Sequence, residues 1–137
     1  MKEYNSVSEP FLADVRAVVG DANVLPMPES WSNINRRGYD PRRFRVPEAV
    51  VRPANAEEIA AVVKLCNKYN VPLTVRSGGT SLADGAIAVC GGIVLLMERL
   101  NKIIEMNTEA MYVVAEAGVR TVDIQKDGQR SRLILRR

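Results

Sequence analysis

The sequence contains no histidine and only two cysteines among its 137 residues. Without imidazole, a Ser-His-Asp triad, a Cys-His pair and a histidine-ligated metal site are all excluded within these residues. Cys66 and Cys90 lie in apolar stretches and form no Cys-x-x-Cys spacing, which favours buried, reduced thiols over a metal site or a disulfide framework. Enzyme classes that depend on a catalytic or metal-binding histidine are thereby excluded within these residues, and no metal site is expected.

Long hydrophobic runs are also missing. The N-terminus lacks a basic start followed by an apolar segment of about 7 to 15 residues, and no stretch approaches the roughly 18 apolar residues of a membrane span. We therefore expect a cytoplasmic protein without a membrane span. Apolar residues make up 47% of the chain and charged residues 26%, which is typical of one soluble domain with its own core.

The body of the chain also lacks an excess of basic charge. There are 19 Lys and Arg against 16 Asp and Glu, but residues 127–137 hold four of the arginines and one aspartate, which leaves 15 of each sign. Five arginines between 36 and 45 can grip a phosphate or form a solvated loop, and we favour the loop. Aromatic residues are only 5%, so no nucleic-acid partner is expected.

The first half of the chain alternates between regular and irregular patterns. Apolar spacing predicts an amphipathic helix over 9–19, whereas the four prolines of 26–47 predict a long irregular segment. A short apolar run at 49–51, bounded by prolines, predicts a strand. The Asn-x-x-Glu spacing of Asn55 and Glu58 is a capping box, which predicts a helix that continues to 69.

The second half is predicted to contain short strands. Residues 72–75 should form a strand that returns parallel to 49–51 after one helix, and ligands bind at the carboxyl ends of such strands. Further strands are expected at 93–96, 103–106 and 112–115. A last helix starts at 121, and we expect Asp127-Gly128 to break it after two turns at most.

A glycine loop, residues 76–86 with the sequence RSGGTSLADGA, follows the strand at 72–75. Adjacent glycines permit positive φ and let backbone N–H groups approach a ligand, and three hydroxyl side chains add hydrogen-bond donors. This is the chemistry that a diphosphate needs. The loop matches neither the Gly-x-Gly-x-x-Gly pattern nor a Walker A loop, and from glycine spacing alone a simple tight turn is an equally good interpretation.

The sequence on both sides of the loop favours a diphosphate-binding loop over a simple tight turn. From Pro47 to Gly118 the chain has, in order, a P-x-x-V-V-x-P strand, an E-E-I helix, a second strand, an R-S-G-G-T-S loop, a G-G-I-V-L strand, an L-N-K-I turn and an E-A-G-V strand end. This series closely resembles the FAD-binding domain (PCMH type) of the flavin oxidoreductases related to vanillyl-alcohol oxidase. The branch with glycolate oxidase and D-lactate dehydrogenase subunits is the most similar.

The resemblance implies an α+β fold in which an N-terminal βαβ subdomain is followed by the beginning of a second, largely antiparallel subdomain, truncated here. It implies three regions: a helix and an Arg/Pro-rich segment at 1–46, a partial FAD-binding domain at 47–126, and a basic tail at 127–137 outside the family sequence. It also implies FAD as cofactor and a small-molecule substrate, such as a 2-hydroxy acid of the glycolate or D-lactate type.

The resemblance also implies which residues bind FAD, by their positions in the matching motifs. The FAD diphosphate would be wrapped by Arg76, Ser77, Gly78, Gly79, Thr80, Ser81 and Leu82, with Gly85 at the loop exit and Pro47 near the adenine. Relatives of the berberine-bridge type have His where Thr80 stands and bond the flavin through it, so the resemblance implies noncovalent FAD here. Family members commonly have Gly at Asp84, whose carboxylate should weaken diphosphate binding unless it points away or is paired.

No catalytic base can be assigned from these residues. Arg52, Arg76 and Glu116 flank predicted strand ends, and a structural role is the better interpretation for each. We therefore expect a piece that is inactive by itself, although its family catalyses FAD-dependent oxidation. The alternative is a nucleotide-binding or assembly fragment with no turnover of its own, which self-associates through exposed apolar surface.

Overall fold

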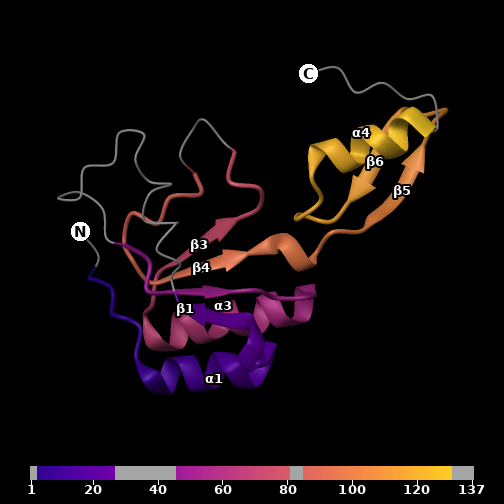
Figure 1. Ribbon diagram of the computed structural model, residues 1–137. Helices are drawn as coiled ribbons and strands as arrows, with labels where there is room; N and C mark the ends of the chain where they lie inside the picture. Colours follow the sequence, from indigo (N-terminus) through magenta and orange to yellow (C-terminus); the bar gives the residue numbers. More distant parts are fainter. Residues whose placement is uncertain (1–2, 27–45, 81–84, 131–137) are drawn as a thin grey trace.

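The computed structural model describes residues 3–26, 46–80 and 85–130. They form an α+β structure in which a four-stranded sheet with two helices on one face leads into a hairpin with a third helix (Figure 1). The α+β class expected from the sequence is confirmed. Of the predicted irregular segment 26–47, residues 27–45 lie outside the described part.

The sheet combines parallel and antiparallel neighbours. Its strands lie in the order β1 (Val24–Pro26), β2 (Ala49–Val51), β4 (Ile93–Leu96) and β3 (Leu73–Arg76). Both β2 and β3 are parallel to β4, whereas β1 is antiparallel to β2. The two strands of the predicted strand-helix-strand unit, β2 and β3, therefore lie on either side of β4. The carboxyl ends of β2, β4 and β3 lie along the same edge of the sheet.

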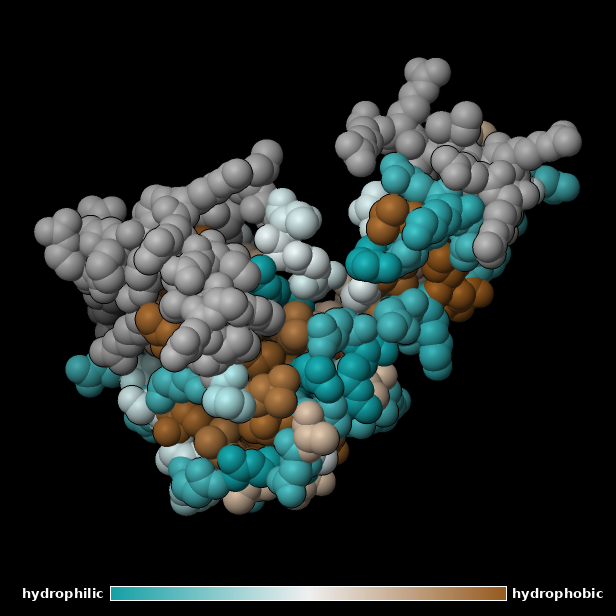
Figure 2. All heavy atoms as spheres, viewed as in Figure 1, coloured by the Kyte–Doolittle hydropathy of each residue, from teal (hydrophilic) through white to brown (hydrophobic). Residues whose placement is uncertain are grey.

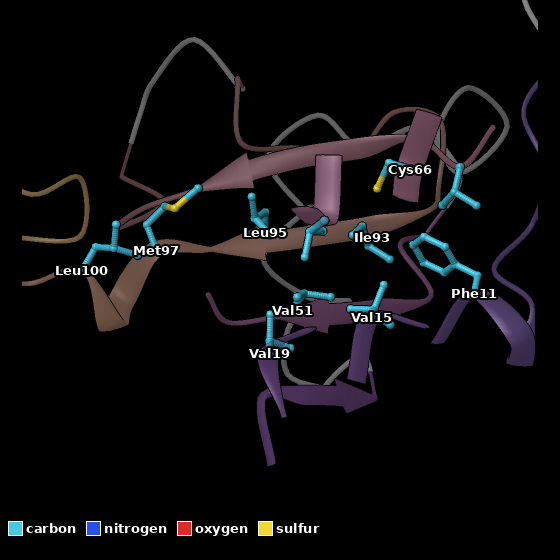
Figure 3. Packing of buried hydrophobic residues seen from close by; sticks show 12 residues of the cluster. Phe11, Val15, Val19, Val51, Cys66, Ile93, Leu95, Met97 and Leu100 are labelled. Carbon is cyan, nitrogen blue, oxygen red and sulfur yellow. The ribbon is translucent and has the colours of Figure 1, made fainter. Parts of the chain in front are cut away.

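The central strands are buried on both faces, which explains their continuous apolar runs. Along β4, Ile93 and Leu95 point into the core under the helices (Figure 3). Val94 and Leu96 join a smaller cluster on the other face. Ala88, from the chain that returns after the glycine loop, belongs to this second cluster. The segment that follows the glycine loop therefore packs against the face of the sheet opposite the helices.

Helix α1 (Glu9–Val19) covers the sheet with the predicted apolar stripe. Phe11, Val15 and Val19 are buried, and the Phe11 ring meets the Tyr69 ring edge to face at 5.5 Å between centroids. Gly20, with φ +84°, ends the helix as expected. A short 3₁₀ turn, η1 (Asp21–Asn23), then leads into β1, a strand that the sequence did not predict.

Helix α3 (Ala56–Tyr69) begins at the predicted cap. The Asn55 Oδ1 accepts from the backbone N–H of Glu58 at 2.8 Å, and the Glu58 carboxylate turns back to accept from the N–H of Ala54 at 2.8 Å. Asn70, in the left-handed region with φ 52°, ends the helix. The capping box predicted from the sequence is confirmed. The Glu58 carboxylate accepts from the N–H of Ala54, one residue before the cap residue Asn55, whose N–H is the usual donor.

Replacing Asn55 with alanine should remove this cap. Loss of a cap hydrogen bond costs about 1 kcal/mol, so the free energy of unfolding in a urea titration should fall by that amount. Asn67→Ala, at an exposed position of the same helix, is the matched control and should leave the unfolding free energy unchanged or slightly higher. Equal effects of the two substitutions would show that the cap is unimportant.

The chain then forms what we call the hairpin unit. After the 3₁₀ turn η3 (Met97–Arg99), it consists of β5 (Ile103–Asn107), β6 (Tyr112–Ala115) and α4 (Thr121–Arg130). The strands are antiparallel, with an irregularity between Ile103 and Glu105. The unit projects beyond the edge of the four-stranded sheet (Figure 1).

The predicted break of the last helix is wrong. Helix α4 continues through Asp127 and Gly128 to Arg130. A glycine inside a helix costs only about 1 kcal/mol relative to alanine. Gly128 is buried, so packing of the helix offsets the low helix propensity of this residue.

The two cysteines differ in burial. Cys66 is a free thiol in the core, and burial raises its pKa to about 11, so that it stays protonated at neutral pH. Cys90 is also free but only half-buried, in contrast to the buried position predicted from its neighbours. Within the described ranges, no helix has the length and apolarity needed to cross a membrane.

Candidate functional site

A cavity of about 850 Å³ lies at the carboxyl ends of β3 and β4, where ligand binding was predicted. One wall comes from the glycine loop and the four-stranded sheet, and the other from the hairpin unit; the surface is visibly hollowed between them (Figure 2). The lining residues are Arg76, Ser77, Gly78, Leu96, Glu98, Asn101, Lys102, Ile103, Gly118, Val119, Arg120, Asp123 and Asp127.

The glycine loop begins with a tight turn that requires its second glycine. Gly79 has φ +65°, in the left-handed region that side chains disfavour. A Cβ at Gly79 would also lie less than 3 Å from the guanidinium atoms of Arg76, which folds back over the turn. At Gly78, in contrast, a Cβ would meet only the Thr80 hydroxyl at 4.0 Å. A ligand can therefore approach the backbone at Gly78 closely.

Ser77 connects the loop to the opposite wall. Its Oγ lies 2.5 Å from the carbonyl oxygen of Ala117, at the turn between β6 and α4. Both Ser77 and Gly78 are exposed, so the face of the loop that lines the cavity is open to solvent.

The opposite wall depends on Gly118, whose role sequence reasoning missed. The Gly118 N–H donates to the Leu100 carbonyl at 2.8 Å. A Cβ there would lie less than 3 Å from the carbonyl oxygens of Met97 and Leu100. The glycine of the E-A-G-V strand end was the available signal, but only the folded hairpin shows what it approaches.

Charges of both signs line the cavity. Arg120 donates to both carboxylate oxygens of Asp123, from Nε at 2.7 Å and from Nη2 at 3.1 Å. These hydrogen bonds hold the pKa of the Asp123 carboxyl below its usual value and raise the pKa of Arg120. Arg76 and Lys102 add positive charge, whereas Glu98 and Asp127 add negative charge.

Two of the charged groups that flank strand ends have the structural contacts that were expected. Arg52 Nη1 lies 2.9 Å from Glu98 Oε1 and links the end of β2 to η3. The Glu116 carboxylate accepts from the backbone N–H of Lys102 at 2.8 Å and fixes the base of the hairpin.

The structure brings together part of the predicted site. Arg76, Ser77 and Gly78 line the cavity, and Gly79 and Thr80 follow them directly, whereas Gly85 is exposed with open space around it. Ser81, Leu82 and Asp84 lie outside the described residues. Pro47 is buried just before the amino end of β2, at the opposite edge of the sheet from Ser77. Among the described residues there is no group of His, Cys, Asp and Glu that could hold a metal ion.

These features define a class of site. Open backbone from a glycine turn and an arginine converge at the carboxyl edge of parallel strands, which suits a ligand that carries phosphate groups.

Comparison with known proteins gives the family. Residues 47–136 match the family described as "FAD binding domain", so the chain belongs to the FAD-binding domains of FAD-linked oxidoreductases. The match begins at the predicted residue 47 and crosses the boundary predicted at 127.

The individual relatives are longer proteins. The chain is 32% identical to a D-lactate dehydrogenase of Anaerostipes hadrus, with 96% of this chain and 28% of that protein covered. It is 34% identical to the glycolate oxidase subunit GlcD of Bacillus subtilis, with 71% and 22% covered. The solved structure of p-cresol methylhydroxylase with substrate bound superimposes with a TM-score of 0.77 at 27% identity, covering 93% of this chain and 26% of that one. The chain thus spans about a quarter of the length of these relatives.

Proposed function

We propose that this chain is the FAD-binding portion of a flavin-dependent oxidoreductase that acts on a 2-hydroxy acid of the glycolate or D-lactate type. The observation that carries the proposal is the cavity at the strand ends, lined by Arg76, Ser77 and Gly78. FAD supplies the redox chemistry when bound, and the chain's own residues bind and orient it. No residue of the chain is assigned as the catalytic base.

The diphosphate would be held by residues 76–82, through backbone N–H groups of the glycine turn and the positive charge of Arg76. The structure offers two supports: the open backbone at Gly78 and the left-handed turn at Gly79. We retain Gly85 as the exit of the loop. Pro47 would lie near the adenine, which requires the dinucleotide to extend across the sheet toward its amino edge.

The choice of substrate depends on the relatives. The two relatives reported above are named for D-lactate and glycolate, both 2-hydroxy acids, whereas the structural neighbour acts on p-cresol. The higher sequence identity to the first two favours the 2-hydroxy acid. We also propose a cytoplasmic location, although three relatives, from Arabidopsis thaliana, Danio rerio and Kluyveromyces lactis, are named as mitochondrial D-lactate dehydrogenases.

Noncovalent attachment leads to a simple prediction. Because Thr80 stands where histidine bonds the flavin in some relatives, and the sequence has no histidine, FAD bound to this chain should be released completely by acid. Acid-precipitated protein should be colourless, with all flavin absorbance in the supernatant. A yellow pellet after repeated washing would contradict noncovalent binding.

The proposal is tested by titrating the purified chain with FAD and following the flavin fluorescence. Saturable quenching that ADP reverses is the expected result, because ADP contains the diphosphate and adenosine of FAD. A duplex DNA oligonucleotide should not compete. No change in fluorescence over the whole titration would contradict the assignment of the cavity to FAD.

A second candidate is a nucleotide-binding or assembly fragment without turnover. It is favoured by the exposed apolar side chains of the hairpin unit: Ile104 is 66% exposed, Met111 75% and Val114 41%. Such a surface is suited to contact with a second copy or another chain. The spectrum of the purified chain at about 450 nm separates the two candidates. A flavin band is expected for the first, whereas a colourless protein that gains stability on addition of FAD or ADP supports the second.

A further inference from the structure

Ser77 lies where the glycine loop meets the hairpin unit. Its Oγ is 2.5 Å from the carbonyl oxygen of Ala117, 40 residues further along the chain. The next residue, Gly118, donates its N–H to the carbonyl of Leu100 at 2.8 Å. A series of hydrogen bonds thus connects the loop, the turn between β6 and α4, and the end of η3 around the cavity.

The chemistry of this contact restricts what Ser77 can do. A serine hydroxyl carries one proton, and a carbonyl oxygen is only an acceptor, so the proton of Ser77 points to Ala117. The hydroxyl then has only lone pairs left. A phosphate oxygen is also an acceptor and cannot use them, whereas the backbone N–H groups of the loop have no such restriction.

The contact joins two walls that are built separately. The glycine loop continues β3, which is hydrogen-bonded into the four-stranded sheet, and the turn at 116–119 is fixed against η3 through Gly118. Because Ser77 is exposed, its hydrogen bond can be removed without opening the core. Loss of the bond would let the walls move apart while each stayed folded.

We infer that Ser77 is a positioning residue, whose hydroxyl ties the glycine loop to the turn at 116–119 and sets the width of the cavity. The FAD diphosphate, which this inference takes from the proposed function, is left to the backbone N–H groups of the loop. Ala117 contributes its backbone carbonyl oxygen, so this hydrogen bond depends on the side chain of Ser77.

The test is amide hydrogen exchange on the full chain without ligand, for the wild type, Ser77→Ala and Ser77→Thr. Removing one hydrogen bond should increase exchange of the Gly118 and Val119 amides by about three- to tenfold, since both are hydrogen-bonded in this turn. Amides of α3 should not change. Ser77→Thr keeps the hydroxyl and should restore the slow exchange. Ser6→Ala, at an exposed serine of the N-terminal segment, is the matched control and should match the wild type.

FAD affinity is measured separately on the same variants. Ser77→Ala should bind FAD about three- to tenfold more weakly and Ser77→Thr should recover. Unchanged exchange at Gly118 and Val119 in Ser77→Ala would overturn the inference, and a loss of affinity alone would then indicate that the hydroxyl contacts FAD. If the wild type binds no FAD, the proposed function fails, but the exchange result still decides whether the tie exists.

Discussion

Replacing Gly118 with alanine is expected to reduce FAD affinity roughly a hundredfold. The new Cβ would lie less than 3 Å from two backbone carbonyl oxygens, those of Met97 and Leu100. Neither oxygen is on a flexible side chain, so η3 or the turn at 116–119 must move. Overpacking of this kind costs about 3 kcal/mol, and the cavity loses one wall when the turn moves. Fluorescence titration with FAD measures the effect.

The control for this variant lies in the same unit. Glu109→Ala changes an exposed side chain in the turn of the hairpin and should leave FAD affinity unchanged. Circular dichroism should show that Gly118→Ala keeps the helices α1 and α3, because the atoms nearest the new Cβ belong to Met97 and Leu100 and not to either helix. FAD affinity of Gly118→Ala equal to that of Glu109→Ala would mean that the hairpin unit forms no part of the binding site.

Replacing Gly79 with alanine is expected to weaken FAD binding about tenfold with little loss of stability. A left-handed conformation costs alanine about 1 to 2 kcal/mol, and Gly79 has φ +65°. The Cβ must also displace the guanidinium of Arg76, which is flexible and can move. The loop would then relax to another conformation, and the backbone N–H groups proposed to bind the diphosphate would move. The dissociation constant for FAD and the unfolding free energy are both measured.

Gly20 offers a matched control for this backbone effect. It also has a positive φ, +84°, and a Cβ there would meet only Asn23 at 3.7 Å. Gly20→Ala should therefore cost stability through the end of α1 and leave the FAD dissociation constant unchanged. A similar loss of affinity in both variants would show that the effect of Gly79→Ala comes from general destabilisation.

The local parts of the fold could be predicted from the sequence because their signals are local. The cap of α3 depends on Asn55 and Glu58, three residues apart, and the stripe of α1 depends on spacing within 11 residues. The run of apolar residues at 93–96 indicated a strand, and the structure has a buried strand there. In each case the residues that carry the signal are close together in the sequence.

The non-local parts could not be predicted. Strand β1 has three residues, and among the described strands it pairs only with β2, from which residues 27–48 separate it along the chain. The position of β4 between β2 and β3 is set by packing on both faces. The second wall of the cavity depends on how the hairpin folds against η3, and no pattern within residues 116–120 contains that information.

The most direct measurement is an NMR titration of the uniformly labelled chain with ADP. Saturable shifts are expected for the backbone amides of Ser77, Gly78, Gly79 and Thr80, with smaller shifts at Gly118 and Val119. Inorganic sulfate at the same concentration serves to separate specific binding from a general salt effect. Saturable shifts confined to residues away from the glycine loop, or no shifts at any ADP concentration, would contradict the proposal that this loop binds the FAD diphosphate.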